Sequence, residues 1–474
     1  MDTTHSQPEP PLCVDLDGTL VKLDTLHQAV LSLLRRAPLT LLNLPRWIKL
    51  GRAHTKHQVA QHAPLNVATL PYNQALLAHL KQQKASGRQL VLVTAANERT
   101  AHAVADHLQL FDDVLASTET HNLFGSAKRD ALQQRYPTFD YAGDSPSDLP
   151  VWQAARHAIL VNPHPKARAT QPADLLIEER TPPLNTLMRA LRIHQWIKNL
   201  LLFTPLLLAH RITESIPLTQ TLLAFLAFSL TASAIYLLND LLDLAADQHP
   251  PRKRNRPLAA GDLQLINGLR LIPLLLLIAL PLTLLLPPLF NQLLLLYLLL
   301  TTLYSIQLKR RFGWDLLLLT LLYNLRIFAG GAASQTPVSA WLIAFSGLFF
   351  LSLALAKRCT ELNDLTTQNP TEAHHRERPY QPHQYRPLFR IGLLTALLSG
   401  LVLTGYLLSD KVQQLYSQPH LLWGLLPLLL FWLLRIWQRV LNGTLHDDPL
   451  VATISDPITY CIALLICLLV HLAS

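Results

Sequence analysis

Cysteine is scarce in this sequence, which has four in 474 residues. The four share no framework spacing and lie at Cys13, Cys359, Cys461 and Cys467. This pattern does not fit a small domain that is held together by disulfides. We expect all four to be reduced packing residues, one in a core strand and three in apolar helices.

The chain also lacks a secretory signal at its amino end, because Met1 to Pro11 is polar and rich in proline. The residues that follow, up to about residue 180, carry His, Gln, Asp and Lys throughout. A chain of this length is too long for one ordinary domain. We therefore expect a soluble domain over residues 1–180 that stays in the cytosol.

Apolar runs are missing from that first part but dominate the rest. Half of all residues are hydrophobic, and the chain becomes rich in leucine from about Trp196. Runs of about 20 apolar residues are candidates for transmembrane helices. We expect a linker with an amphipathic entry at 181–193, then a membrane domain at 194–474. Its nine predicted spans are 194–211, 217–240, 266–288, 290–306, 313–332, 338–358, 388–408, 419–438 and 455–473.

Basic residues follow the even-numbered spans, whereas the odd-numbered loops are nearly bare. Because cytoplasmic loops carry an excess of Lys and Arg, this asymmetry predicts the orientation. We expect the amino terminus, the soluble domain and the four basic loops to share the cytosolic side of a bacterial inner membrane. The cations are Arg252, Lys253, Arg254 and Arg256; Lys309, Arg310 and Arg311; Lys357, Arg358, Arg376, Arg378 and Arg386; Arg435 and Arg439.

An acidic stretch stands where the second span meets its basic loop. Asn239, Asp243 and Asp247 are spaced i, i+4, i+8, and Asp240 borders the same stripe, so one helix face would carry them. Clustered carboxylate and amide oxygens suit Mg²⁺, which is usually shared with substrate phosphates. The cations that follow, Lys253, Arg254 and Arg256, suit the other side of a diphosphate or phosphate ester. The simpler alternative is a water-facing helix end with solvated charges.

Polar residues also follow predicted strands in the soluble domain. Two aspartates end the first strand, in Asp15-Leu-Asp17-Gly-Thr, and Thr94 ends a second one. Lys128 comes next, and a third strand leads to Asp144 and Asp148. Strands that alternate with helical segments predict an α/β fold with a parallel sheet, which binds ligands at the carboxyl ends of its strands.

This order of motifs over residues 10–175 resembles the haloacid dehalogenase superfamily of phosphatases. The resemblance implies that Asp15 is the nucleophile and Asp17 the general acid/base. It implies a Mg²⁺ site at Asp15, Asp144, Asp148 and the Asp17 carbonyl, with Thr94 and Lys128 holding the phosphoryl oxygens. A degenerate domain that is kept for binding is the alternative.

Residues 25–75 separate the first two motifs and predict a small helical cap over the site. They contain several basic or histidine positions that could attract an anionic substrate, although a solvated surface is the simpler interpretation for most of them. These positions include Arg46, Lys49, Arg52, His54 and Lys56.

Nine predicted helices and an Asn-Asp-x-x-Asp-x-x-x-Asp stretch after the second resemble the UbiA superfamily of intramembrane prenyltransferases. At the sixth helix, however, the sequence has Lys357, Arg358 and Glu361 where most members carry a second aspartate-rich motif. This departure resembles the branch of polyprenyl-phosphate 5-phosphoribosyltransferases. Further agreement comes from two stretches, one with Lys198 and Asn199, the other with Lys309, Asp315 and Arg326.

Phosphoribosyl pyrophosphate would fit this residue set, because it carries a diphosphate and a distant 5-phosphate. The acids, with Asp240 and Asp243 as the catalytic pair, would hold Mg²⁺ and the leaving diphosphate. The 5-phosphate and the phosphate of a polyprenyl phosphate call for Lys and Arg. Two alternatives stay open for single residues: an intrahelical ion pair for Lys357 and Glu361, and snorkelling for Lys198.

We therefore expect a cytosolic phosphatase-like domain fused to a membrane transferase. The transferase would form polyprenyl phosphoryl-5-phosphoribose, and the phosphatase-like domain would remove the 5-phosphate. One alternative is prenyl transfer from a prenyl diphosphate to an aromatic acceptor. The other is an ion-coupled transporter with a regulatory domain, although the sequence shows no second copy of the acidic stretch. The lipid's chain length and the oligomeric state are not predicted.

Overall fold

The computed structural model describes residues 9–179, 181–250, 253–306, 308, 311–367, 380–445, 448–452 and 456–474. The chain divides into two compact units. The first contains Met1–Leu191 and Tyr236–Ile272, and the second contains Arg192–Ile235 and Pro273–Ser474. The stretch that follows the second predicted span thus belongs, by its contacts, to the unit that contains the amino-terminal domain.

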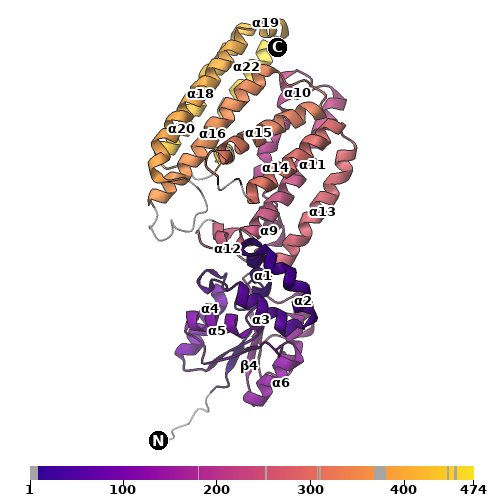
Figure 1. Ribbon diagram of the computed structural model, residues 1–474, viewed down its shortest axis with the longest axis vertical. Coiled ribbons are helices and arrows are strands. Elements are labelled where there is room, and N and C mark those ends of the chain that lie inside the picture. The colour runs from indigo at the N-terminus through magenta and orange to yellow at the C-terminus, as the bar shows by residue number, and fades with distance from the viewer. Residues whose placement is uncertain are drawn as a thin grey trace. The chain divides into compact units, whose positions relative to one another are not determined.

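A six-stranded sheet forms the centre of the first unit (Figure 1). Its order is β3-β2-β1-β4-β5-β6, and every pair is parallel. This confirms the α/β fold that the alternating segments predict. The strands are β1 Leu12–Val14, β2 Leu90–Asn97, β3 Asp113–Ser117, β4 Asp140–Gly143, β5 Ala158–Val161 and β6 Leu175–Ile177.

Helices connect these strands, as parallel pairing requires. Because β1 lies between two neighbours and has no contact with water, its three residues are all apolar. Cys13 packs there with Val91, Tyr141 and Trp152 in one core cluster. The connecting helices are α4 Gln74–Ala85, α5 Glu98–Leu108, α6 Ser126–Arg135, α7 Leu149–Trp152 and α8 Pro165–Thr170.

A helical insertion between β1 and β2 confirms the predicted cap. Its buried centre contains Leu33, Trp47 and Val59. Asn66 and Asn73 cap the starts of its last helical turn and of the following helix α4 with their side chains. The insertion consists of α1 Thr25–Arg36, η1 Pro38–Asn43, α2 Leu44–Lys49, α3 Arg52–His62 and η2 Val67–Thr69.

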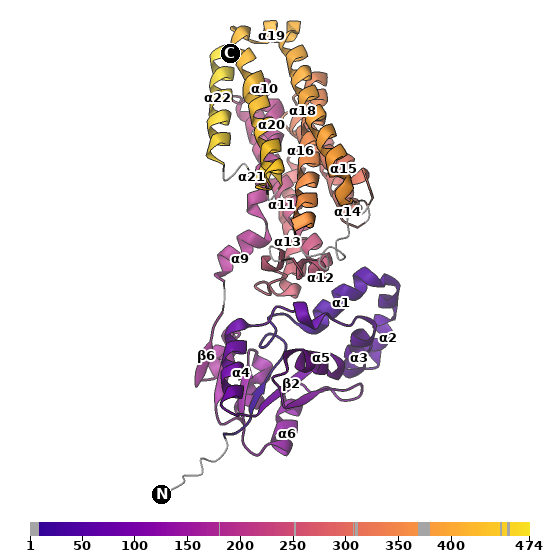
Figure 2. The ribbon, with the colours of Figure 1, turned by 90° about the vertical axis from the view of Figure 1, so that its left-hand side faces the viewer.

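The second unit is helical, and its helices α16, α18 and α20 run side by side in both views (Figure 2). Its boundaries with the first unit fall inside α11 and α13. The longer helices are α11 Ser215–Leu242, α13 Leu265–Leu284, α14 Pro288–Ile306, α15 Trp314–Ala333, α16 Ala340–Thr367, α18 Tyr385–Leu407, α20 Leu425–Leu441 and α22 Pro457–Ala473. The shorter ones in this unit are η4 Ile193–Phe203, α10 Thr204–Leu208, η7 Pro382–Gln384, α19 Asp410–Leu415, η8 Pro419–Gly424 and α21 Pro449–Ala452. Three further short helices belong to the first unit: α9 Pro183–Ala190, α12 Leu244–Asp247 and η5 Lys253–Asn255.

Seven helices in the described part of the chain are long and apolar enough to cross a membrane. The prediction of nine spans is therefore not confirmed. The first predicted segment is the 3-10 helix η4 followed by the short α10, and the last is α22 with 17 residues. Proline explains the break in the first segment, because Pro205 stands at the start of α10.

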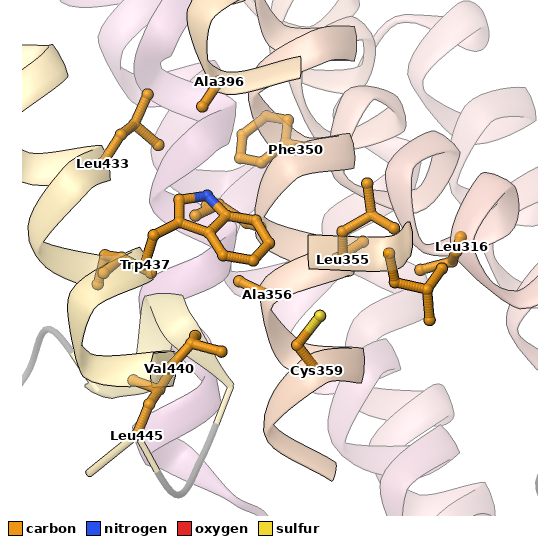
Figure 3. Close-up of a cluster of buried hydrophobic side chains, with 14 of the residues drawn as sticks. Leu316, Phe350, Leu355, Ala356, Cys359, Ala396, Leu433, Trp437, Val440 and Leu445 are labelled. Atoms are coloured by element: carbon orange, nitrogen blue, oxygen red, sulfur yellow. The ribbon is translucent and has the colours of Figure 1, made fainter. Parts of the chain in front are cut away.

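Close packing holds α16, α18 and α20 together around Trp437 (Figure 3). A Cβ atom on Gly392 of α18 would lie 2.1 Å from two ring carbons of Trp437, so glycine is required for the approach. The indole nitrogen of Trp437 donates to Ser352 Oγ at 3.0 Å, and that hydroxyl donates to the Gly392 carbonyl at 2.8 Å. The indole therefore has its polar group satisfied inside the core.

The cysteines only partly match their prediction. All four are free, and Cys13 and Cys359 are buried as expected. Cys461 and Cys467 are exposed on α22, so the expectation that they pack inside the protein is wrong. Leucines with exposed side chains also lie on α22, as an apolar helix that faces lipid would present them.

Candidate active sites

The acids of the soluble domain meet where the strand order reverses. β1 is flanked by β2 on one side and by β4 on the other. Asp15 directly follows β1, and Asp144 directly follows β4. This is the switch point at which open parallel sheets bind ligands. The sequence therefore places both carboxylates at the same edge through topology alone.

Three carboxylates form a group that suits a hard cation. One oxygen from each of Asp15, Asp144 and Asp148 lies within 4.8 Å of the others. Burial, with the charges of Asp148 and Asp15, raises the pKa of Asp144 well above its usual value. Gly18 makes the turn possible, since its φ is +81° and a Cβ there would lie 2.5 Å from Asp144. The donor set and the crowded negative charge fit Mg²⁺.

Lys128 is the cation that the structure itself supplies to this group. Its Nζ donates to Asp15 at 2.9 Å, to the Tyr141 hydroxyl at 2.9 Å and to Asp148 at 3.3 Å. Burial alone would lower the pKa of Lys128, but the charges of Asp15 and Asp148 raise it above its usual value. Lys128 therefore stays charged beside the predicted nucleophile.

Asp15 and Asp17 differ in ways that fit a nucleophile and a proton donor. Burial raises the pKa of Asp15 to about 6, although the charge of Lys128 lowers it. Burial and the charge of Asp24 raise the pKa of Asp17 to about 7. The Thr25 backbone N–H donates to Asp17 Oδ1 at 2.8 Å and fixes that side chain. A carboxyl group tuned close to neutrality can both give and take a proton.

A cavity of about 310 Å³ opens over these acids. Its lining includes Asp15 and Asp17, the cap residues Lys56 and Val59, and the Gln264–Ile266 segment that starts α13. Lys56 donates to the Asn122 side chain at 2.9 Å, and burial lowers its pKa. The cap therefore contributes a cation to the cavity, as the basic residues of that insertion allow.

Thr94 lies deeper than its predicted role requires. It is fully buried, and its hydroxyl accepts from the Ala96 backbone N–H at 2.9 Å. It is not among the residues that line the cavity. Its contact with a phosphoryl group stays a prediction.

The acidic stretch after the second span keeps helical spacing. α11 ends at Leu242 and α12 begins at Leu244, yet backbone bonds join Asp243 N–H to the Asn239 carbonyl at 2.8 Å and Asp247 N–H to the Asp243 carbonyl at 2.9 Å. Within the described chain, the buried Asn239 Oδ1 has no hydrogen-bond partner. A buried oxygen without a donor fits a bound cation.

Arg256 bridges two of these acids. Its Nη1 lies 3.1 Å from Asp240 Oδ1 and also contacts Asp247. Lys253 lies 3.7 Å from Asp247, whereas Arg254 is exposed. Burial raises the pKa of Asp247, although the charges of Arg256 and Lys253 lower it. Two of the three predicted cations thus contact the acids themselves.

The sequence reasoning missed Arg35, which lies in the cap. Its Nη1 contacts Asp243 Oδ1 at 3.1 Å and donates to the Leu242 carbonyl at 3.1 Å. Gln28 of the same helix donates to Gln248 at 2.8 Å in a buried contact. No sequence signal links residues about 200 positions apart, so these contacts could not be predicted.

In the second unit, two predicted lysines converge on an acid that was not predicted. The Nζ atoms of Lys198 and Lys357 lie 2.9 Å and 3.1 Å from Asp448 Oδ2. The Tyr323 hydroxyl donates to the same carboxylate at 3.1 Å. Burial would raise the pKa of Asp448, but Lys198 and Lys357 together hold it below its usual range. The signal that could have revealed it is a pair of adjacent acids, Asp447-Asp448, in the loop after the eighth predicted span.

Arg358 is buried and forms ion pairs with two acids, so its guanidinium is not exposed to solvent. It is 1 % exposed and contacts Asp315 and Glu361, while its guanidinium lies 5.1 Å from the Tyr380 ring. The intrahelical pair that the sequence allowed for Lys357 and Glu361 is replaced by one between Arg358 and Glu361, at i, i+3. Lys357 instead contacts Asp448.

Arg326 is held by its surroundings in the same unit. It donates to Asn199 Oδ1 at 2.9 Å, to the Leu322 carbonyl at 2.7 Å and to the Tyr297 hydroxyl at 3.1 Å. Asn199 in turn donates to Ser229 at 2.9 Å. Arg326 and Asn199, two of the predicted substrate-binding residues, therefore fix each other's side chains. Lys309, also predicted to bind substrate, lies outside the described residues, as do the loop cations Arg252, Arg310, Arg376 and Arg378.

Comparison with known proteins gives the family. Residues 200–453 match the UbiA prenyltransferase family, and residues 12–153 match haloacid dehalogenase-like hydrolases. The protein y4nM of Sinorhizobium fredii is 36% identical over 96% of this chain and 89% of its own length. The nodulation protein NoeC of Azorhizobium caulinodans is 30% identical over 58% of this chain and 88% of its own.

A third relative matches a shorter part of the chain. Decaprenyl-phosphate phosphoribosyltransferase of Mycobacterium tuberculosis is 32% identical over 38% of this chain and 63% of its own length. The UbiA match covers more than half of the chain, and the hydrolase match covers the domain that holds Asp15 and Lys128. The chain belongs to the UbiA prenyltransferase family and carries a haloacid dehalogenase-like hydrolase domain before its membrane part.

Proposed function

We propose that this protein transfers 5-phosphoribose from phosphoribosyl pyrophosphate to a polyprenyl phosphate. A phosphate oxygen of the lipid attacks the anomeric carbon, the bond from that carbon to the diphosphate breaks, and diphosphate leaves. The product is a polyprenyl phosphoryl-5-phosphoribose. The observation that carries this proposal is the presence of Lys357 and Arg358 on α16, where most members of the family have acids for a second metal site.

The assigned roles follow from charge. Asn239, Asp243 and Asp247 would hold Mg²⁺, which neutralises a leaving diphosphate when bound. Lys198 and Lys357 carry the positive charge that an additional phosphate needs, and Asp448 keeps both in place. Similarity to decaprenyl-phosphate phosphoribosyltransferase supports the substrate class.

The hydrolase domain would then remove the 5-phosphate. An Asp15 oxygen attacks phosphorus, the bond from phosphorus to the ribose oxygen breaks, and Asp17 gives that oxygen a proton. Water next attacks the phosphorus of the aspartyl phosphate and gives a proton to Asp17, which releases inorganic phosphate and restores Asp15. Lys128, 2.9 Å from Asp15, neutralises charge as the phosphoryl group arrives.

Incubation of the full chain with Mg²⁺, phosphoribosyl pyrophosphate and a polyprenyl phosphate tests the transfer. Mass spectrometry should find a lipid that has gained ribose, with or without its 5-phosphate. Asp243→Ala should lower the rate about a hundredfold, because a charge-stabilising contact in the transition state is lost. Turnover of a prenyl diphosphate with an aromatic acid, and none with phosphoribosyl pyrophosphate, would replace the proposal with aromatic prenylation.

A further inference from the structure

The cap carries a group of exposed apolar side chains that nothing in the catalytic proposals uses. They lie in residues 34–52, named here the cap tip, where α1 ends and η1 and α2 follow. Leu39 and Leu42 are 78% and 76% exposed, and Ile48 and Leu50 are 60% and 61% exposed. Exposed apolar residues that gather in this way mark an interaction surface.

These exposed side chains are separate from the hydrophobic core of the cap. Leu33, Trp47 and Val59 are buried in that core. Ile48 directly follows Trp47 and yet points to solvent, so the segment presents one apolar face inward and another outward. Burying the cap's own interior therefore leaves the outer apolar face without a partner among the described residues.

The charge of the cap indicates what kind of surface it meets. Four cations of the cap tip are exposed: Arg36, Arg46, Lys49 and Arg52. Between Thr25 and Asn97 the sequence has no Asp and no Glu. Exposed Leu and Ile mixed with Lys and Arg, and free of acids, is the pattern of a segment that lies in the interface of an anionic bilayer.

A separate observation places the end of α1 beside the end of a membrane span. Arg35 lies in the last turn of α1 and donates to the carbonyl of Leu242 at 3.1 Å. Leu242 is the final residue of the candidate span Ser215–Leu242. The cap tip begins at this point of α1, where a bilayer surface is expected because the span ends there.

We propose that the cap tip inserts its exposed leucines and isoleucine into the interface of an anionic membrane, with its four cations at the level of the lipid phosphates. Membrane insertion of the cap tip does not depend on the substrate of either active site. It would nevertheless affect how a substrate reaches the hydrolase site, because α1 and α3 of the cap also line the cavity over Asp15. Anchoring the cap holds that cavity next to the membrane, where a phosphomonoester on a lipid would be presented.

Site-specific quenching in nanodiscs tests the contact with the full chain. The exposed Cys461 and Cys467 are replaced by alanine, and a fluorophore is attached at Leu42→Cys. Lipids with a nitroxide high on the acyl chain should quench it at least about threefold more than a fluorophore at Gln134→Cys, an exposed site on α6. The difference should shrink when anionic lipids are replaced by zwitterionic ones.

A charged variant separates insertion from mere proximity. With the fluorophore at Ile48→Cys, the changes Leu39→Asp, Leu42→Asp and Leu50→Asp should lower quenching to the level of the Gln134 site. These side chains are exposed, so the cap should still fold, which hydrolysis of p-nitrophenyl phosphate checks. Equal quenching at Leu42 and Gln134 in anionic nanodiscs overturns the proposal. Cross-linking of Leu42→Cys to a second copy of the chain, without lipid quenching, also overturns it and assigns the surface to self-association.

Discussion

At the scale of the residue, Lys128 balances the negative charge of the buried carboxylates in the hydrolase site. Three buried oxygens, from Asp15, Asp148 and Tyr141, share its ammonium group. Its removal leaves two buried carboxylates without their cation, which typically costs about 3–5 kcal/mol. The same position could be predicted from sequence as a phosphoryl-binding cation, but its bond to Tyr141 could not, because only the folded sheet brings that residue close.

Lys128→Met should therefore lower hydrolysis of p-nitrophenyl phosphate at least about a hundredfold. It should also lower the melting temperature of the domain, since methionine has similar length but no charge. Enzyme assays and thermal unfolding check the two effects. Arg129→Met, at the neighbouring position whose side chain is 38% exposed and contacts Asp130, is the control and should change neither. Hydrolysis within about twofold of the native rate would remove Lys128 from the site.

Asp448 has the corresponding role in the second unit, where it orders Lys198 and Lys357. Asp448→Asn keeps the shape but removes the charge that attracts both lysines. The two ammonium groups should then repel each other, and the Michaelis constant for phosphoribosyl pyrophosphate should rise about tenfold or more. Steady-state transfer assays measure this. Asp410→Asn, an exposed acid on α19, should leave transfer unchanged.

If Asp448→Asn binds phosphoribosyl pyrophosphate as well as the native protein does, the two lysines do not meet a substrate phosphate. Hydrolysis by the amino-terminal domain should stay normal in either case. This readout separates loss of the lysine arrangement from loss of folding.

At the scale of the element, the length of the apolar runs predicted most of the long helices but misjudged the first span. The pattern over 194–211 is apolar enough for a helix, yet the structure has the 3-10 helix η4 and the short α10. Pro205 and the left-handed backbone at His210 interrupt it. Hydropathy registers apolar content but not the loss of a backbone donor at proline, so the break was not predicted.

Helix packing gives the element-scale prediction, because Gly392 allows α18 to approach Trp437 of α20. Gly392→Val would add a Cβ atom that lies only 2.1 Å from two carbons of the Trp437 indole ring, so the two helices would have to move apart. Overpacking of this kind costs about 1–3 kcal/mol. Thermal unfolding of the detergent-solubilised protein should show a lower midpoint. Gly347→Val on α16 has open space and should leave the midpoint within error.

At the scale of the whole molecule, the two domains were predictable because each has a compositional signature. Charged strand-and-turn motifs mark the hydrolase, and leucine-rich runs mark the membrane part. The contacts of Arg35 with Leu242 and Asp243 were not predictable, nor was the grouping of Tyr236–Ile272 with the hydrolase domain. Those features depend on side chains far apart in the sequence, for which a single chain gives no periodic signal.

The fusion itself yields the final prediction, because the proposed transfer makes a phosphomonoester that the hydrolase domain could consume. Joining both activities in one chain raises their effective concentration for a shared lipid. Asp15→Asn keeps the size of the side chain but removes the nucleophile. In this variant the transferase should run while the 5-phosphorylated lipid accumulates, whereas the native protein should yield mainly the dephosphorylated lipid and inorganic phosphate. Mass spectrometry of the lipid after equal times decides between them. If both proteins give only the 5-phosphorylated form, the hydrolase acts on another phosphomonoester, and the transfer proposal is left intact.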